Sequence, residues 1–317
     1  MSPRTAALSA CACLALSACG GGSTDAATTS TAGAASAAPA ATEQLQVATA
    51  FYPLEFLARR LCGDAATVEN LTAPGAEPHD LELTPQQVAR LGEADLVVYL
   101  AGFQPAVDEA VEQQAEDAGF DVSTVTELQP GYVPVEEGEA HEDEEGLDPH
   151  VWLAPLRYAD IADAVAERMG SLAPAQATVF TDRAAQLRGE LETLDGEFTT
   201  GLATCEREQV VTSHNAFGYL ASAYGLEQVS ITGLTPEEEP SPGRLAQVTR
   251  YAEANGVTTI FFEELVSPAV AETLADEVGA EAVELSPLEG APETGDYFTQ
   301  MRANLTTLRT ALGCTGT

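Results

Sequence analysis

Short β-branched segments alternate with helical patterns in both halves of the chain, and about forty residues between the halves contain no strand pattern. This alternation predicts mostly parallel sheets built from βα units. A helix should begin beside Thr84, a residue type that caps helices well, with Pro85 at its first position. The expected strands cover residues 45–50, 67–71, 95–100, 209–213, 258–263 and 281–285.

The segment between the halves carries apolar residues at helical spacing on both sides of Ala173-Pro174, such as Tyr158 and Val165 before it and Phe180 and Leu187 after it. It is too long for an ordinary crossover helix. We therefore predict an α/β fold of two lobes joined by a long helical spine, with a ligand between the lobes. The alternative is one large sheet with an oversized helical insertion.

The first residues have the features of a secretory signal. Residues 1–18 combine Arg4 with a short apolar stretch, which cannot cross a ~30 Å hydrocarbon core as a mature helix. Leu16-Ser17-Ala18-Cys19 resembles a bacterial lipobox, so Cys19 is the expected site of lipid attachment. Cys11 ends a similar pattern, but cleavage there would leave too short an apolar region. The chain is therefore expected outside the cytoplasm, anchored by lipid to the outer face of the cell membrane.

The remaining residues divide into a tether and a folded body. Residues 19–43 contain no Val, Ile, Leu or aromatic side chain, so we expect a flexible tether. The predicted N-terminal lobe covers 44–153, the linking helix 154–198 and the C-terminal lobe 199–317.

The chain is strongly acidic, with 13 Lys and Arg against 50 Asp and Glu and a formal net charge of -37. Phosphate backbones are therefore poor partners, which excludes nucleic-acid binding as a function class. Such a surface concentrates cations, although a charged coat for solubility explains most of it equally well. Seven carboxylates and His141 lie between Glu136 and Glu145, either as an auxiliary metal-capture loop or as a solvated charge run.

Cys62, Cys205 and Cys314 follow the proposed lipid-attachment residue. An oxidising compartment favours a disulfide. If Cys205 pairs with Cys314, the bond closes a loop of about a hundred residues and contributes up to ~4.7 kcal/mol on the chain-entropy model. Cys62 is then either a buried thiol or an alternative partner.

Three of the four histidines occupy loop or strand-end positions. His79 lies in a turn-rich loop, His150 follows Asp148-Pro149, and His214 ends an expected parallel strand, where α/β sheets place ligand-binding groups. Each histidine alone could be a structural residue. Together they indicate a shared metal site, and imidazole suits zinc.

These residues belong to longer motifs. Glu77-Pro78-His79-Asp80, Asp148-Pro149-His150-Val151-Trp152 and Ser213-His214-Asn215-Ala216-Phe217 occur in order, followed by Phe262-Glu263 and Gly295-Asp296-Tyr297. The chain from about residue 45 to 312 resembles the zinc/manganese-type solute-binding lipoproteins of ABC importers, the cluster 9 family.

The resemblance implies two Rossmann-like lobes joined by a long rigid helix, with a metal held between them by four side chains. It assigns His79 and His150 to the N-terminal lobe, His214 to the C-terminal lobe and Asp296 as the carboxylate ligand, with Glu77 as the competing candidate. Manganese-type members carry Glu where His214 stands, which favours zinc. Three imidazoles and one carboxylate at ~2.0–2.2 Å also suit tetrahedral Zn²⁺, whereas Mn²⁺ prefers more oxygen ligands.

The resemblance further implies a monomeric carrier that delivers Zn²⁺ to an ABC permease and its ATPase. The alternatives are a manganese-binding importer component, an adhesin-like surface lipoprotein with a structural metal, and a zinc hydrolase. A hydrolase needs an open metal position for water, which a coordinated Asp296 would fill. The sequence also lacks His-Glu-x-x-His, Gly-x-Ser-x-Gly and a phosphate-binding glycine loop, so we do not expect an enzyme.

Overall fold

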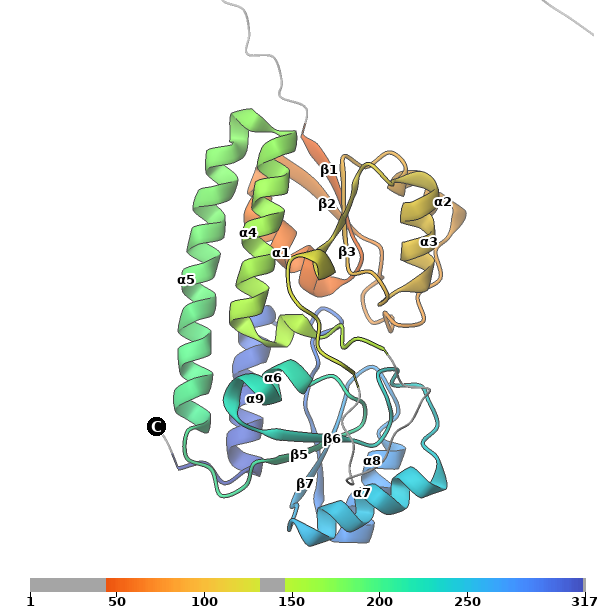
Figure 1. Cartoon of the computed structure of the whole chain (residues 1–317), viewed down its shortest axis with the longest axis vertical. Helices are drawn as coiled ribbons and strands as arrows, with labels where there is room; N and C mark the ends of the chain where they lie inside the picture. Colours follow the sequence, from red (N-terminus) through yellow and green to blue (C-terminus); the bar gives the residue numbers. More distant parts are fainter. Residues whose placement is uncertain (1–43, 132–145, 316–317) are drawn as a thin grey trace, which may run out of the picture. The chain divides into compact units, whose positions relative to one another are not determined.

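The computed structural model describes residues 44–131 and 146–315, which form two four-stranded parallel sheets with helices packed around them (Figure 1). This arrangement confirms the predicted α/β class. The proposed signal peptide, Cys19, the tether and the acidic segment with His141 lie outside the described residues. Within the described ranges, no helix has the length and apolar character needed to cross a membrane.

The first sheet has the strand order β2-β1-β3-β4, and every neighbouring pair is parallel. The sequence did not predict β4, because its three residues are only half-buried and carry no alternating pattern. The strands are β1 (Leu45–Thr49), β2 (Ala66–Asn70), β3 (Leu96–Tyr99) and β4 (Gly119–Asp121). The helices between them are α1 (Tyr52–Cys62), α2 (Pro85–Leu91) and α3 (Pro105–Gln114).

The second sheet repeats this topology with the order β6-β5-β7-β8. The sequence did not predict β6, which has Val229 as its one aliphatic residue. The strands are β5 (Gln209–Thr212), β6 (Glu227–Ser230), β7 (Thr259–Phe262) and β8 (Glu281–Glu284). The helices of this part are α6 (Gly218–Tyr224), α7 (Pro242–Ala254), α8 (Ala269–Val278) and α9 (Tyr297–Ala311).

The start of α2 confirms the predicted cap. The Thr84 hydroxyl accepts the backbone N–H of Gln87, and the Gln87 side chain accepts the backbone N–H of Thr84. This reciprocal pair satisfies two N–H groups that the helix itself leaves unbonded. It therefore fixes the point at which the His79 loop ends.

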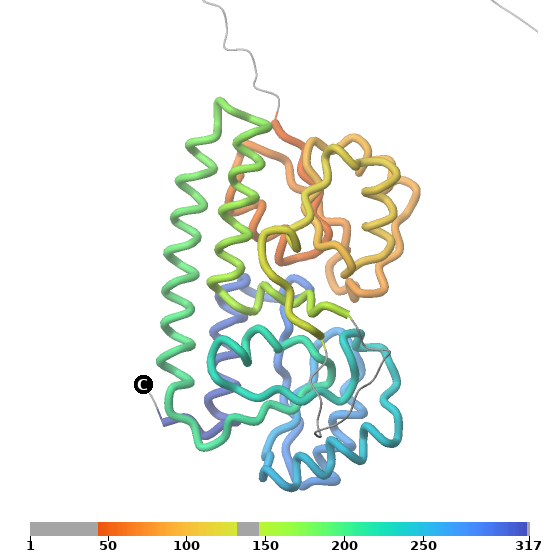
Figure 2. The backbone as a smooth tube through the Cα atoms, in the orientation of Figure 1, coloured from red at the N-terminus to blue at the C-terminus, as the bar shows by residue number. Residues whose placement is uncertain are grey.

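The predicted linking helix over 154–198 is two antiparallel helices, α4 (Pro155–Leu172) and α5 (Ala177–Leu202), rather than one. The break falls at Ala173-Pro174, because proline lacks an N–H and disfavours helical geometry in the preceding residue. Figure 2 shows α5 running along both halves of the structure, where it packs against α1, α4 and α9. Its buried residues recur every three or four positions, and each fully buried Leu or Phe stabilises the fold by about 1.5–3 kcal/mol. They include Phe180, Leu187, Leu191, Leu194 and Phe198.

In the structure Cys205 and Cys314 form a disulfide, and Cys62 is a buried free thiol. Cys205 lies shortly after α5 and Cys314 shortly after α9, and the two are 109 positions apart in sequence. The bond therefore joins the ends of two helices that pack against each other.

Reducing this disulfide should lower the free energy of unfolding by about 2–4 kcal/mol, because the reduced unfolded chain regains the entropy of an open loop. Guanidinium unfolding with and without reductant measures the change, and Cys62→Ser serves as the control that should respond equally. Peptide mapping of oxidised protein that found Cys205 or Cys314 as free thiols would contradict the pairing.

Candidate metal centre

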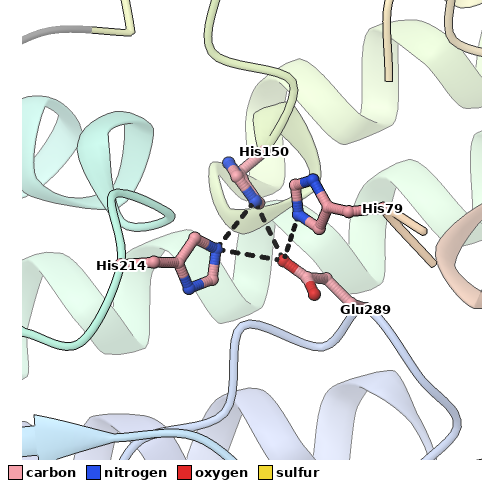
Figure 3. Close-up of side chains that lie close together, drawn as sticks. All are labelled: His79, His150, His214 and Glu289. Atoms are coloured by element: carbon pink, nitrogen blue, oxygen red, sulfur yellow. Dashed lines mark hydrogen bonds and ion pairs between the residues drawn. The ribbon is translucent and has the colours of Figure 1, made fainter. Parts of the chain in front are cut away.

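Four side chains from separate segments converge on one point: His79, His150, His214 and Glu289 (Figure 3). One nitrogen or oxygen atom from each lies within 4.8 Å of all the others. His79 comes from the loop before α2, and His150 immediately precedes a short 3-10 turn, Val151–Leu153. His214 follows β5 and Glu289 follows β8, so the second sheet supplies two members from the carboxyl ends of its strands.

The distances in this cluster match four-coordinate geometry. Glu289 Oε1 lies 2.9 Å from His150 Nε2, 3.3 Å from His214 Nε2 and 3.4 Å from His79 Nε2. The Nε2 atoms of His150 and His214 are 3.3 Å apart. A tetrahedron with metal–ligand bonds of about 2.0–2.1 Å has edges of about 3.3–3.4 Å. Three of these four separations match the edges of such a tetrahedron, and all the ligand atoms lie within 4.8 Å of one another, so the cluster is close to the spacing that Zn²⁺ requires.

Carboxylates behind two of the rings direct their nitrogens toward this point. His150 Nδ1 lies 2.7 Å from Asp148 Oδ1, which also accepts the backbone N–H of His150 at 2.9 Å. His214 Nδ1 lies 2.5 Å from Glu263 Oε1. A carboxylate can only accept, so both Nδ1 atoms carry a hydrogen, and in the neutral form of each ring the Nε2 lone pair then faces the cluster. This is the tautomer that a metal requires.

His79 is held in a different way. Its ring meets the ring of Phe103 edge-on, with centroids 4.6 Å apart, and Gln104 Nε2 donates to the carbonyl of Pro78 at 3.0 Å. The His79 side chain is 8% exposed, whereas those of His150 and His214 are fully buried. His79 is therefore the histidine of the cluster nearest to solvent.

Burial and charge act in opposite directions on these groups. Burial lowers the pKa of His79. Burial also opposes protonation of His150 and His214, but Asp148, Glu263 and Glu289 outweigh it, so the pKa of His150 is raised and that of His214 lies well above its usual value.

Glu289 shows the complementary shift. Burial favours its neutral form, but hydrogen bonds from the three histidines hold its pKa well below the usual value. With the imidazoles neutral, Asp148, Glu263 and Glu289 leave three negative charges in a buried region. A bound divalent cation offsets most of that charge, which favours a 2+ ion over an uncharged ligand.

The structure brings together His79, His150 and His214 as predicted, but it places Glu289, and not Asp296, beside them. Asp296 is the N-cap of α9, where its Oδ1 accepts the backbone N–H of Thr299 at 3.0 Å and the Thr299 hydroxyl at 2.9 Å. Aspartate is a common N-cap residue at the start of a helix, and the aspartate of the Gly-Asp-Tyr motif has this structural role here.

Glu77, the competing candidate, also lies outside the cluster of potential ligands. Its Oε2 accepts the backbone N–H of Asp80 at 3.1 Å, so it shapes the loop that carries His79. Burial, together with the charge of Glu289, raises the pKa of Glu77 to about 8.

The position of Glu289 in the sequence is itself a signal, although Glu289 does not belong to the motifs that carry the resemblance. Glu289 follows the expected strand 281–285 within a turn-rich segment, Ser286-Pro287-Leu288-Glu289-Gly290. The rule that singled out His214, a polar residue just beyond the carboxyl end of a parallel strand, applies equally to Glu289.

The comparisons with known proteins identify a zinc-uptake family and zinc-binding relatives. The family model described as zinc-uptake complex component A, periplasmic, matches residues 47–311. The zinc-binding protein AdcA of Streptococcus pyogenes serotype M6 is 35% identical over 293 residues, covering 84% of this chain and 56% of AdcA. The high-affinity zinc uptake system protein ZnuA of Bacillus subtilis is 33% identical over 314 residues, covering 94% of each. The chain thus spans little more than half of AdcA but nearly all of ZnuA.

Solved structures share the fold. The laminin-binding protein Lmb of Streptococcus agalactiae, described as bifunctional with adhesin and metal transporting activity, has a TM-score of 0.76 and 31% identity, covering 84% of this chain and 99% of Lmb. Zn(II)-bound AdcA from Streptococcus pneumoniae has a TM-score of 0.72 and 32% identity, covering 86% of this chain and 59% of AdcA.

Glu289→Ala and Asp296→Ala should separate the ligand from the helix cap. Glu289→Ala should weaken zinc binding strongly, because it removes the oxygen that faces all three Nε2 atoms. Asp296→Ala should leave zinc affinity unchanged and lower the free energy of unfolding by about 1 kcal/mol through loss of the cap. Isothermal titration and thermal unfolding of both variants measure the two effects, and the reverse assignment of losses would restore Asp296 as the ligand.

Proposed function

The chain belongs to the family of zinc-uptake complex component A, and we propose that it captures Zn²⁺ outside the cytoplasm and delivers it to an ABC importer. The observation that carries the proposal is the convergence of three imidazole nitrogens and one carboxylate oxygen, each from a different segment. His79, His150, His214 and Glu289 are the proposed ligands, and the ion is cargo rather than a resident cofactor.

The donor set favours zinc over manganese as the cargo. Three nitrogen donors and one oxygen suit Zn²⁺ in four-coordinate geometry, whereas Mn²⁺ prefers sites richer in oxygen. The names of AdcA and ZnuA, and the Zn(II)-bound state of the pneumococcal structure, point the same way.

The arrangement suits reversible capture better than catalysis. Glu289 completes a tetrahedral set, so zinc bound there keeps no position for the water that a zinc hydrolase activates. The family is a class of solute-binding proteins, and we propose that this chain has no enzymatic activity. Because the ligands come from separate segments, moving one segment lowers the coordination number and provides a way to release the ion.

The partners we propose are an ABC permease with its ATPase, as expected for a component of a zinc-uptake complex. We further propose that the protein acts as a monomer, held at the outer face of the cell membrane by lipid on Cys19. The acidic segment with His141 has two proposed roles, auxiliary metal capture or a solvated charge run.

An adhesin is the second candidate function, because the description of Lmb as bifunctional combines adhesion with metal transport on the same fold. Solid-phase binding of the purified protein to laminin distinguishes the two. Zinc-dependent growth of a deletion strain, restored by the wild type but not by a ligand variant, supports the carrier.

Replacing His214 should have a far larger effect than replacing His141. His214→Ala removes a proposed ligand, so the loss of zinc affinity should exceed the ~10–100-fold typical of losing a residue that orients a ligand. His141→Ala should leave the affinity of the cleft unchanged. Competition with a chromophoric chelator measures both, and equal losses would show that the ligand assignment is wrong.

Zinc affinity should fall as the pH is lowered. An imidazole must be neutral at Nε2 to bind metal, so zinc competes with protons at each histidine. The raised pKa of His150 and His214 extends this competition above the usual value of about 6.5, so affinity should already decline above that pH and continue to fall below it. Chelator competition on both sides of that pH tests the prediction, and equal affinity at pH 5 and pH 8 would contradict ligation by histidine.

A further inference from the structure

We propose that Trp152 is a positioning residue that holds Glu289 in the zinc site. This inference rests on the proposed function and extends it beyond the ligands. Trp152 Nε1–H donates to the carbonyl of Pro287 at 2.8 Å, across 135 residues of sequence. Trp152 follows His150 by two residues and Pro287 precedes Glu289 by two, so one hydrogen bond connects the segments of two proposed ligands.

The segment Ser286–Glu289, called here the carboxylate arm, has an unfavourable backbone. Leu288 has a φ of 57°, and it is the one residue other than glycine with a positive φ among the described residues. This left-handed conformation crowds the Cβ atom, and it persists only where the surroundings hold it. The Leu288 side chain is fully buried, and its backbone N–H donates to the Ser286 hydroxyl at 3.1 Å.

Helix α9 holds the start of the carboxylate arm. The Asn304 side chain accepts the backbone N–H of Ser286 at 3.2 Å and donates to its carbonyl at 2.6 Å. The Ser286 hydroxyl donates to Glu264 Oε1 at 2.6 Å. These contacts fix the first residue of the arm, three positions before the carboxylate.

Trp152 holds the middle of the arm, and its own position is well defined. It is 1% exposed, and its ring packs against Phe51, Phe103 and His150 with centroids 4.9, 5.7 and 5.2 Å away. Its carbonyl accepts the hydroxyl of Tyr297, the first residue of α9, at 2.6 Å. Because Pro287 is buried, its carbonyl needs this donor, and without it the arm would be free to relax.

The end of the carboxylate arm borders a pocket. This pocket, of about 310 Å³, is lined by Glu289, Gly290 and Ala291 together with Asn70 and Thr72. Hydrogen bonds to the arm, together with the contacts between Glu289 Oε1 and the histidines, therefore hold the carboxylate in the cluster.

A double-mutant cycle tests whether Trp152 acts through Glu289. Trp152→Phe keeps a buried aromatic ring but removes the N–H donor, and should weaken zinc binding about 10–100-fold, the usual effect of losing a residue that orients a ligand. In a Glu289→Gln background the same substitution should cause no further loss, because the ligand that it positions is already impaired. Chelator competition on the four proteins at one pH gives the coupling.

A matched control is Tyr224→Phe, which removes one aromatic hydrogen bond, to Asp195, without touching a ligand segment. It should leave zinc affinity unchanged. Thermal unfolding of the metal-free proteins checks their folding, and Trp152→Leu, which also lacks a donor, replaces Trp152→Phe in the cycle if that variant does not fold.

The outcomes separate this inference from the proposed function. Wild-type protein without zinc affinity, or Glu289→Gln with wild-type affinity, would overturn the ligand set and this inference together. If the ligand variants behave as proposed, Trp152→Phe with wild-type affinity would overturn the positioning role alone. Equal losses in both Glu289 backgrounds would do the same, since Trp152 would then act independently of Glu289.

Discussion

The site depends on one oxygen atom, Glu289 Oε1, which lies within hydrogen-bond or ion-pair distance of the Nε2 atoms of three histidines. The cluster places a carboxylate and the nitrogen lone pairs of neutral imidazoles in a buried region. Asp148 and Glu263 add negative charge behind two of the rings. Burying that much charge is costly unless a cation balances it. This arrangement therefore favours a dehydrated divalent ion as its ligand. Among divalent ions, the geometry and donor types of the site favour zinc.

The fold brings these groups together by using one topology twice. Both sheets have the order 2-1-3-4 in their own strands, and the loops at the carboxyl ends of β5 and β8 carry His214 and Glu289. The loop before α2 and the turn before α4 supply His79 and His150. Helix α5 and the Cys205–Cys314 bond join the parts that carry these loops. Hydrogen bonds hold His150, His214 and the carboxylate arm, which are the least exposed parts of the cluster. His79 is held mainly by packing.

The elements with strong patterns could be predicted from the sequence, and those with weak patterns could not. The six expected strands lie within one residue of their observed ends, and most of them contain neighbouring β-branched or aromatic residues. β4 and β6 were not predicted because they are short and carry few apolar side chains. The helical spine divides at Pro174, and the helical periodicity on either side did not predict this break. The three histidines could be identified from their loop and strand-end positions together with their motifs, whereas the resemblance pointed to Asp296, with Glu77 as the competing candidate, and not to Glu289. The support that Trp152 and Asn304 give to the carboxylate arm consists of contacts between distant segments, and the left-handed conformation of Leu288 that it holds is not revealed by sequence patterns.

The account can be tested most directly by locating the ion. Crystals of the zinc-loaded protein, measured on both sides of the zinc absorption edge, should show one strong anomalous peak about 2.0–2.2 Å from the Nε2 atoms of His79, His150 and His214 and from Glu289 Oε1. A peak coordinated by Asp296 or Glu77 in place of Glu289, or histidine rings turned away from any shared peak, would contradict the account.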